Sequence, residues 1–464
     1  VEELNANNEN GSIMVMTKAK NYHNWYGLVS TYNTKLTKDI DFYGGVDFRF
    51  YKGTHTNDIV DLYGGKYFID STRKSVKPAN NANAADQSWV YQKLGVGDAV
   101  YRDYDGHVVQ EGAFFQAEYS KNGLSSFLSG SLSNTSYWRY DRLYYDKKNA
   151  ESETKNYLGF TVKGGANYNF NEHHNAFFNV GYISRAPKFN YGAFLSFASS
   201  NVTNPDAKNE KVVSFELGYG YRLKWLQVDV NAYWTKWLDK TMAKSSTVGT
   251  AQVDAFVNMT GVNALHKGIE IEAKASPLYW LDVNAMFSIG DWKWDSNAKG
   301  YVFDYNGQPL TKDGSIASGI GAEDHLSTGI NLKGIHVGGA AQTTAALGAT
   351  IKIGKEIRIG ADWTLYARNY AYYSISGSNL SLGKTNTVAD PWRVPTASQF
   401  DLNASYKFKI AGLNATISGN VNNLFDYQYL GKVWNPSSGT ATKDNIYGFY
   451  AFGRTFSTRL KINF

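Results

Sequence analysis

The sequence contains no cysteine, only a few prolines and no block of basic residues. Its 464 residues include 0 Cys and 8 Pro. Without thiols, the chain has no thiolate metal ligand, no thiol nucleophile and no disulfide. This composition fits an oxidising compartment, where stray thiols are avoided. Charged residues make up 19% of the chain and the net charge is +6. Because the positive charge is not gathered into a polybasic patch, we expect no nucleic-acid partner.

Long hydrophobic runs are also missing. No stretch of about 18 apolar residues occurs, so membrane-spanning helices are not expected. Aromatic residues are abundant at 15%, and there are 44 Gly. Few prolines and many aromatics and glycines suit long strands joined by turns. The first residues show neither a basic start nor an apolar segment typical of a signal peptide. We therefore expect a mature chain or a piece of a longer one.

Apolar and polar residues alternate in many segments. Clear examples are residues 226–234, 269–275, 357–365, 400–410 and 454–464. Successive residues of a strand point to opposite faces, so each segment predicts a strand with one apolar and one polar face. No segment shows a persuasive helical period. We expect residues Leu226, Val228, Val230 and Leu402 to face lipid, and residues Asp229, Asn231, Asp401 and Lys407 to face an aqueous interior.

Short turns alternate with long polar segments along the chain. The expected turns lie near residues 37–40, 121–123, 169–175, 223–225, 276–279, 354–356 and 410–412. The expected long segments are residues 52–109, 141–154, 187–210, 238–266, 292–338, 373–396 and 428–449. This asymmetry is typical of outer-membrane barrels. The sequence predicts an all-β, antiparallel transmembrane β-barrel with about 15 strands, the first near residues 21–36. A soluble β-sandwich or propeller is the alternative, but its charged strand faces would need many covering layers.

Several motifs resemble those of TonB-dependent outer-membrane receptors. The segment Gly419–Asp426, followed by Tyr429, resembles their NxxNLFDxxY stretch. Residues 204–210 resemble the NPxLxPE loop, with Ala207 and Asn209 replacing its usual Leu and second Pro. Residues 184–189 resemble an R-A-P-x-F stretch, and residues 453–464 resemble the closing strand. The resemblance is firm over the second half of the chain and rests on pattern alone over the first half.

The resemblance implies the architecture and partners of that family. Family members have a 22-stranded barrel around an N-terminal plug and a short segment that binds TonB. We expect residues 21–464 to form about the last 15 strands and residues 1–20 to lie in an extracellular loop. The plug and the first barrel strands would then be a separate or missing segment. Expected partners are outer-membrane lipid, that segment and the TonB complex acting through the plug, in a Gram-negative-type outer membrane. Some family members also use a surface lipoprotein, which the resemblance adds as a further partner.

The implied function is active import of a scarce nutrient, bound by extracellular loops and the lumen. A passive diffusion porin and an outer-membrane assembly or adhesion scaffold are the alternatives. No enzyme activity, cofactor or metal site is expected. The adjacent His173 and His174 would point to opposite faces of a strand, and no nucleophile motif accompanies any histidine. Asp103 and Asp105 only faintly resemble a calcium loop, because the rest of such a loop is missing.

Aromatic clusters near the predicted loop ends are the candidate ligand-binding residues. Such rings can form a platform that stacks on sugars or planar groups. They can equally form the aromatic girdle of a barrel or pack the loops. The candidates are Tyr137, Trp138, Arg139, Tyr140, Arg142, Trp292, Trp294, Tyr301, Tyr305, Trp392 and Trp434. For the family motifs themselves we expect structural roles: Asn422 and Asn423 in a bulge or turn, Asn204 and Pro205 starting a turn, and Glu210 pairing with a lumenal Lys or Arg.

Overall fold

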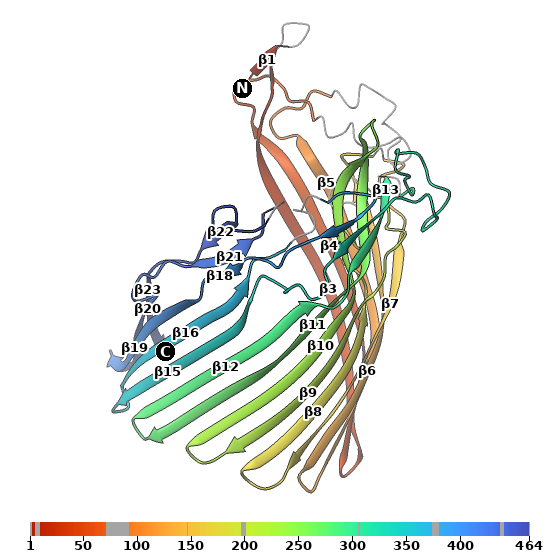
Figure 1. Ribbon diagram of the computed structural model, residues 1–464. Coiled ribbons are helices and arrows are strands. Elements are labelled where there is room, and N and C mark those ends of the chain that lie inside the picture. Colours follow the sequence, from red (N-terminus) through yellow and green to blue (C-terminus); the bar gives the residue numbers. More distant parts are fainter. Residues whose placement is uncertain are drawn as a thin grey trace.

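The computed structural model describes residues 2–4, 10–70, 92–145, 147–195, 201–304, 307–373, 380–436 and 440–463. In these ranges, no helix is long and apolar enough to cross a membrane. Strands dominate the structure, which confirms the all-β prediction (Figure 1).

One antiparallel ladder of long strands forms the wall of a barrel. In spatial order it contains β3 (Met16–Thr37), β4 (Ile40–Asp61), β5 (Ala99–Lys121), β6 (Leu124–Asp141), β7 (Lys155–Asn169), β8 (His174–Arg185), β9 (Glu210–Arg222), β10 (Leu226–Val248), β11 (Val253–Leu278), β12 (Leu281–Trp294), β15 (Ala341–Ile353), β16 (Ile357–Tyr370), β19 (Ala397–Ile410), β20 (Leu413–Asn422) and β23 (Thr455–Asn463). These are 15 strands within the described residues, as the sequence predicted.

The predicted turns lie at one end of the wall, and the long connections lie at the other. All seven short turns occur within two or three residues of their predicted positions. Three boundaries were wrong. The first wall strand begins at Met16 rather than near residue 21. The loop expected at 52–109 shrinks to 62–98, and the segment 238–266 is almost entirely strand, with a turn at 249–252. Strand pairing continues here past the apolar band, because backbone hydrogen bonds do not require apolar side chains.

The pairing register places one apolar row around the whole wall. Val230 lies opposite Ile271, and Leu402 lies opposite Val421. Large apolar side chains of this row are exposed, including Leu132, Leu217 and Ile269. In the other row, Asp229 lies opposite Glu272, Asn231 opposite Glu270, Asp401 opposite Asp362 and Lys407 opposite Thr416. The register therefore keeps the two predicted rows on opposite faces of the wall. That the apolar row faces lipid and the polar row faces the interior stays a prediction.

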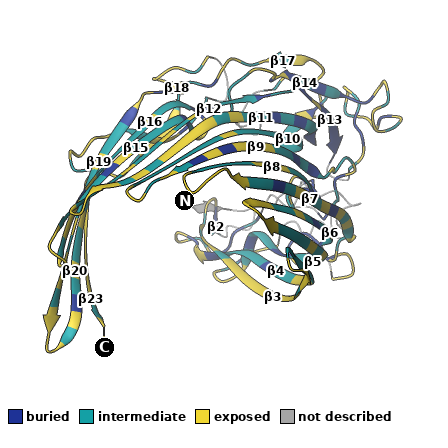
Figure 2. Ribbon diagram, turned by 90° about the horizontal axis from the view of Figure 1, so that it is seen from below, coloured by how far each residue is buried: buried dark blue, intermediate teal, exposed yellow. Residues whose placement is uncertain are grey.

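The first and last wall strands are the margins of the sheet. The strand order is that of a closed barrel in which β23 would be the neighbour of β3. Within the described chain, however, all residue pairs of β3 are with β4, and all those of β23 are with β20. Nearly every residue of both strands is exposed. In Figures 1 and 2 the sheet curves from β3 round to β23, and the two strands stand apart.

Within the described residues, smaller strands and six compact apolar clusters fill the long-loop end. Strands β13 (Ala298–Asp304), β14 (Ser327–Asn331), β17 (Thr385–Thr387) and β18 (Arg393–Val394) extend the wall sheet. Two hairpins, β1 (Glu2–Leu4) with β2 (Asn10–Ser12) and β21 (Leu430–Trp434) with β22 (Tyr447–Tyr450), stand separately. The largest cluster packs Val257, Met259, Val302 and Ile330 between β11, β13 and β14. The buried side chains thus lie mainly at the long-loop end, in the outer parts of strands and in the loops, because the lower wall faces lipid on one side and the lumen on the other.

Candidate ligand-binding site

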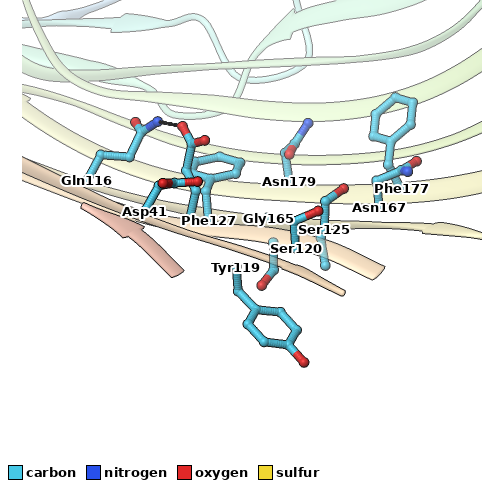
Figure 3. A pocket seen from close by; sticks show the side chains of 13 residues that line it. Asp41, Gln116, Tyr119, Ser120, Ser125, Phe127, Gly165, Asn167, Phe177 and Asn179 are labelled. Carbon is cyan, nitrogen blue, oxygen red and sulfur yellow. Dashed lines mark hydrogen bonds between the residues drawn. The ribbon is translucent and has the colours of Figure 1, made fainter. Parts of the chain in front are cut away.

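The polar face of the lower wall carries an open hollow of about 660 Å³. Asp41, Gln116 and Asn179 project into it, whereas Tyr119, on the apolar row, points to the opposite side (Figure 3). The ring of Phe177 lies over the neighbouring strand at Gly218, where a Cβ would come within 2.1 Å of a ring carbon. The hollow therefore combines carboxylates, amides and aromatic rings on the lumenal face.

Aromatic and amide side chains meet on the lumenal face near the long-loop end. The indole N–H of Trp292 donates a 2.9 Å hydrogen bond to the hydroxyl of Tyr233. The ring of His266 lies 5.5 Å from that of Trp292. Gln342 fixes the Trp292 backbone from both sides, with its Oε1 accepting from the N–H at 3.0 Å and its Nε2 donating to the carbonyl at 3.0 Å. Trp292 is thus held rigidly, with its ring against the lumenal face.

A second pocket of about 390 Å³ opens above this aromatic group. It lies between the outer part of β10 and two loop segments. Pairing of β10 with β9 ends at Leu238, so the edge of β10 beyond that point borders the pocket. The lining residues are Lys188, Asn190, Tyr191, Thr241, Met242, Ala243, Lys244, Ser245, Tyr372 and Tyr373. We call this the β10-edge pocket.

Basic side chains surround the β10-edge pocket. Arg185 donates to Glu210 at 2.5 Å, which confirms the ion pair expected for Glu210. The Lys240 ammonium lies 4.9 Å from the Trp237 ring centre. Burial lowers the pKa of Lys240; the carboxylate of Glu210 opposes this shift, and the charges of Lys188 and Arg185 add to it. Lys236 occupies the outward row below these residues and forms an ion pair with Asp295, so the basic group lies beyond the apolar band.

The candidates on β6 divide between the two faces of the sheet. Tyr137 points inward and donates a 3.1 Å hydrogen bond to the Pro187 carbonyl. Arg139 is fully buried, 4.2 Å from the Tyr104 ring. Trp138 and Tyr140 lie on the outward row, where Trp138 stacks on His107 at 4.7 Å. Arg142 directly follows the end of β6. Alternation along the strand therefore separates residues that are adjacent in the sequence.

The remaining candidates lie in three separate places. Trp294 is 8% exposed within the largest loop cluster. Tyr301 stacks on His325 at 4.7 Å. Trp392 and Trp434 lie near the β21–β22 hairpin, where the Tyr372 N–H donates to the Val433 carbonyl at 2.7 Å. Tyr305 lies outside the described residues, as does the terminal Phe464. Of the candidates, Trp292 is the one whose ring joins the aromatic group below the β10-edge pocket.

Asp103 and Asp105 bind cationic side chains. Arg142 donates to Asp103 at 2.7 Å and to Asp105 at 2.9 Å, and Lys52 lies 2.9 Å from Asp105. In the described part of the chain, no group of three or more His, Cys, Asp or Glu residues could hold a metal ion. The carboxylates of Asp103 and Asp105 instead belong to an ion-pair network that joins β4, β5 and the end of β6.

The family-motif residues have structural roles, as expected. Asn423 adopts a φ of 53° and accepts a 2.9 Å hydrogen bond from the Tyr427 N–H. Asn204 is 4% exposed, donates to the Gly192 carbonyl and accepts from Asn258, each at 2.8 Å. These contacts close the turns that the motifs occupy.

Sequence reasoning missed most of the β10-edge pocket. Lys244 and Thr241 were assigned to a loop, and Tyr191 and Tyr372 are isolated aromatics without a local pattern. Lys188 falls in the R-A-P-x-F stretch, which was the one available signal. The pocket is lined by residues from three segments that are distant in the sequence, so no local sequence pattern predicts it.

Comparisons with known proteins identify the family. The model of the TonB dependent receptor-like β-barrel matches residues 3–424. Among solved structures, the copper transporter OprC has a TM-score of 0.61 at 15% identity, covering 97% of this chain and 58% of its own. The ferric yersiniabactin uptake receptor FyuA from Yersinia pestis has a TM-score of 0.56 at 12% identity, covering 98% and 57%.

A third structure, the ferric citrate transporter FecA in the unliganded form, has a TM-score of 0.55 at 11% identity, covering 96% and 55%. No curated protein sequence matches the chain. The chain spans about half the length of the solved structures it resembles. At these identities the structural likeness shows the fold, whereas the family model covers most of the sequence. The chain therefore belongs to the TonB-dependent receptor family, as an outer-membrane β-barrel.

Proposed function

We propose that the protein imports a scarce nutrient across the outer membrane, with energy supplied by TonB through a plug inside the barrel. The observation that carries this proposal is the lumenal face, which bears a fixed aromatic group and a basic pocket at its outer end. The ligand is captured there by loop and lumen residues before transport. Three solved relatives are named as transporters or uptake receptors of copper, ferric citrate and ferric yersiniabactin. A chelated metal is accordingly the first cargo class to test.

Opposed carboxylates on the lumenal face support the presence of a plug. Asp229 lies directly opposite Glu272, and Asp362 lies opposite Asp401. Like charges in opposed positions destabilise a sheet. Within the described residues, no ion pair reaches any of these four. Lysine or arginine side chains of a plug would neutralise them.

The margins of the wall support the same proposal. Unpaired backbone groups cost several kcal/mol each in hydrocarbon, so an open sheet edge is not tolerated there. Strands β3 and β23 therefore need partners, and further barrel strands would supply them. A surface lipoprotein that covers the loops is a further proposed partner, supported only by the resemblance to the family.

Uptake assays distinguish this proposal from a passive porin. Cells that produce the protein are supplied with a radiolabelled ferric chelate, in the presence and absence of functional TonB. We expect accumulation that requires TonB and saturates at low concentration. Diffusion that is proportional to concentration and indifferent to TonB would favour the porin. Absence of transport, together with assembly defects in other outer-membrane proteins, would favour the scaffold.

A further inference from the structure

We infer that the outer hairpin of β21 and β22 and the last wall hairpin of β20 and β23 form one interrupted ladder, whose free edge docks a single long strand. This inference rests on the proposed pairing of β23 with a further barrel strand. It adds that this strand continues beyond the membrane and also pairs with β22. The partner is an extended segment of the same receptor, with apolar side chains that cover the aromatic rings of β22.

Backbone pairing stops at the end of the wall and then resumes between the same two lengths of chain. The last pair of β20 with β23 is Asn422 with Thr455. The first pair of β21 with β22 is Leu430 with Tyr450. Both pairings are antiparallel, so β21 continues the line of β20 and β22 continues that of β23, at the long-loop end (Figure 1). The free edge of β22 therefore lies on the same side as that of β23.

The NxxNLFD motif holds the two lengths of chain together across the interruption. The side-chain amide of Asn423 donates to the Phe452 carbonyl at 3.2 Å, and the carboxylate of Asp426 accepts from the Arg454 N–H at 2.7 Å. Asn423 and Asp426 have φ values of 53° and 54°, so the chain leaves strand conformation here without leaving its neighbour. The interruption is thus an irregularity within one ladder, as a β-bulge is.

Large aromatic side chains along this edge are largely uncovered in the described structure. Tyr447, Phe449, Tyr450 and Phe452 are 66%, 68%, 69% and 89% exposed. Each such ring offers about 150–250 Å² of surface, and contiguous exposed apolar surface of a few hundred Å² marks an interaction site. Because β22 lies outside the hydrocarbon, water can satisfy its backbone. The rings are therefore the evidence for a partner there.

The neighbours of the outer hairpin leave one side for that partner. Val433 is 4% exposed in an apolar cluster between the long loops, so one face of the hairpin is already packed. On the other face the ring of Phe449 lies 5.7 Å from that of Trp434. The edge of β21 is occupied at Tyr372, whose N–H donates to the Val433 carbonyl at 2.7 Å. Within the described residues, all pairs of β22 are with β21, so its opposite edge is the side that remains.

A barrel strand explains this edge better than a separate surface protein. A strand must pair with β23 in hydrocarbon, and it leaves the membrane beside Thr455. The wall strands β3, β4 and β5 contain 22, 22 and 23 residues, and a strand of that length spans the edge from Asn463 to Tyr447. This chain covers 55–58% of the length of three solved relatives, so the relatives contain additional chain.

Hydrogen exchange tests the two halves of the edge separately. The complete receptor is kept in outer-membrane vesicles, and mass spectrometry reads the amides of β22 and β23 that point away from β21 and β20. We expect both sets to exchange slowly. Phe449→Lys with Phe452→Lys should accelerate exchange in β22 about tenfold and leave β23 protected, because lysines on a strand edge oppose docking. Ile316→Lys with Ile320→Lys is the matched control, since these side chains are 57% and 54% exposed in another loop.

Cross-linking identifies the segment that covers the rings. p-Benzoylphenylalanine in place of Phe449 is activated by light in whole cells, and the linked peptides are sequenced. We expect a peptide of the same receptor from outside residues 1–464, with alternating apolar and polar residues. The control position is Tyr279, which is 93% exposed at a short turn and should not capture this peptide.

Four results would overturn the inference. Fast exchange in β22 with slow exchange in β23 would retain the further barrel strand and end it at the membrane. Cross-linking of position 449 to β3 would show direct closure of the barrel and remove both the partner strand and this inference. Cross-linking to a different surface protein alone would assign the rings to that protein, and a yield no higher than at Tyr279 would leave them without a partner. TonB-dependent uptake tests the import function independently of these outcomes.

Discussion

Trp292 and Tyr233 are joined across three strands by a 2.9 Å hydrogen bond from the indole N–H to the phenol oxygen. Because both residues belong to the lumenal row, the bond fixes two aromatic rings on the inner face. Trp294 points to the same side but is 8% exposed inside the loop cluster. The two tryptophans, adjacent on one face of β12, therefore differ in what they contact.

Replacement of these tryptophans should separate binding from loop stability. Trp292→Phe should weaken ligand binding while a heat-modifiable barrel still forms, since the bond to Tyr233 lies on the surface of the lumen. Trp294→Ala should destabilise the loop cluster by about 3–5 kcal/mol, as expected for a large core residue. Ligand binding and limited proteolysis of the outer loops measure the two effects. If both variants bind normally and resist protease, neither role is correct.

Close packing of Phe177 on Gly218 predicts a selective effect of adding a methyl group. A Cβ at position 218 would lie 2.1 Å from the Phe177 ring, so Gly218→Ala must displace that ring. We expect a loss of about 1–3 kcal/mol in the free energy of unfolding. Gly181→Ala is the control, because the nearest atom to its Cβ is Lys163 Cγ at 3.5 Å, an ordinary contact. Urea unfolding in lipid vesicles compares the two variants, and equal stability would show that the ring moves freely.

The two faces of β10 predict opposite responses to arginine. Val230 lies on the apolar row opposite Ile271, whereas Asn231 lies on the polar row opposite Glu270. Val230→Arg should cost about 2–4 kcal/mol near the middle of the bilayer. Asn231→Arg should cost little, since Glu270 offers it a carboxylate. Refolding into vesicles measures both. A larger loss at position 231 would reverse the assignment of the faces.

The periodic parts of the fold could be predicted from the sequence, whereas the β10-edge pocket could not. Alternation alone fixes which side of the wall a residue such as Val230 or Asp229 occupies, and turn residues fix where strands reverse. The outer ends of the strands could not be predicted from this alternation. Asp239, with a φ of 55°, marks a bulge beyond which β10 continues to Val248. The pocket beside that bulge also requires Tyr372, more than 120 residues away in the chain. Such contacts depend on tertiary packing that no local pattern encodes.

The ion-pair network at Asp105 predicts acid sensitivity of the outer strand ends. Glu111 and Asn134 occupy the outward row between this network and the apolar residues, so it lies outside the membrane. Burial would raise the pKa of Asp105, but hydrogen bonds from Arg142, Thr54 and Lys52 outweigh it and hold the pKa well below its usual value. A depressed pKa means that the network stabilises the fold above pH about 4 and loses this contribution as the pH falls further.

Hydrogen exchange of β5 and β6 between pH 6 and pH 3 measures this effect. Protection of their outer ends should fall with acid in the wild type. In Asp105→Asn it should already be low at pH 6 and change less with pH. An unchanged pH response in the variant would assign the acid sensitivity to other carboxylates.

The margins of the wall give the last prediction. All residue pairs of β3 are with β4 and all those of β23 are with β20 in the described chain, and both strands are exposed on both faces. In hydrocarbon, their outward backbone groups require partners. We expect the amides of β3 that point away from β4 to exchange slowly in the membrane-embedded protein, because further strands cover them. Spin labels at Val29 and Leu460 should meanwhile report a separation far beyond the spacing of neighbouring strands, about 5 Å. Slow exchange with a short distance between the labels would mean that β3 and β23 close the barrel directly. A closed barrel of this size would have little room for a plug, and the passive porin would then become the better explanation.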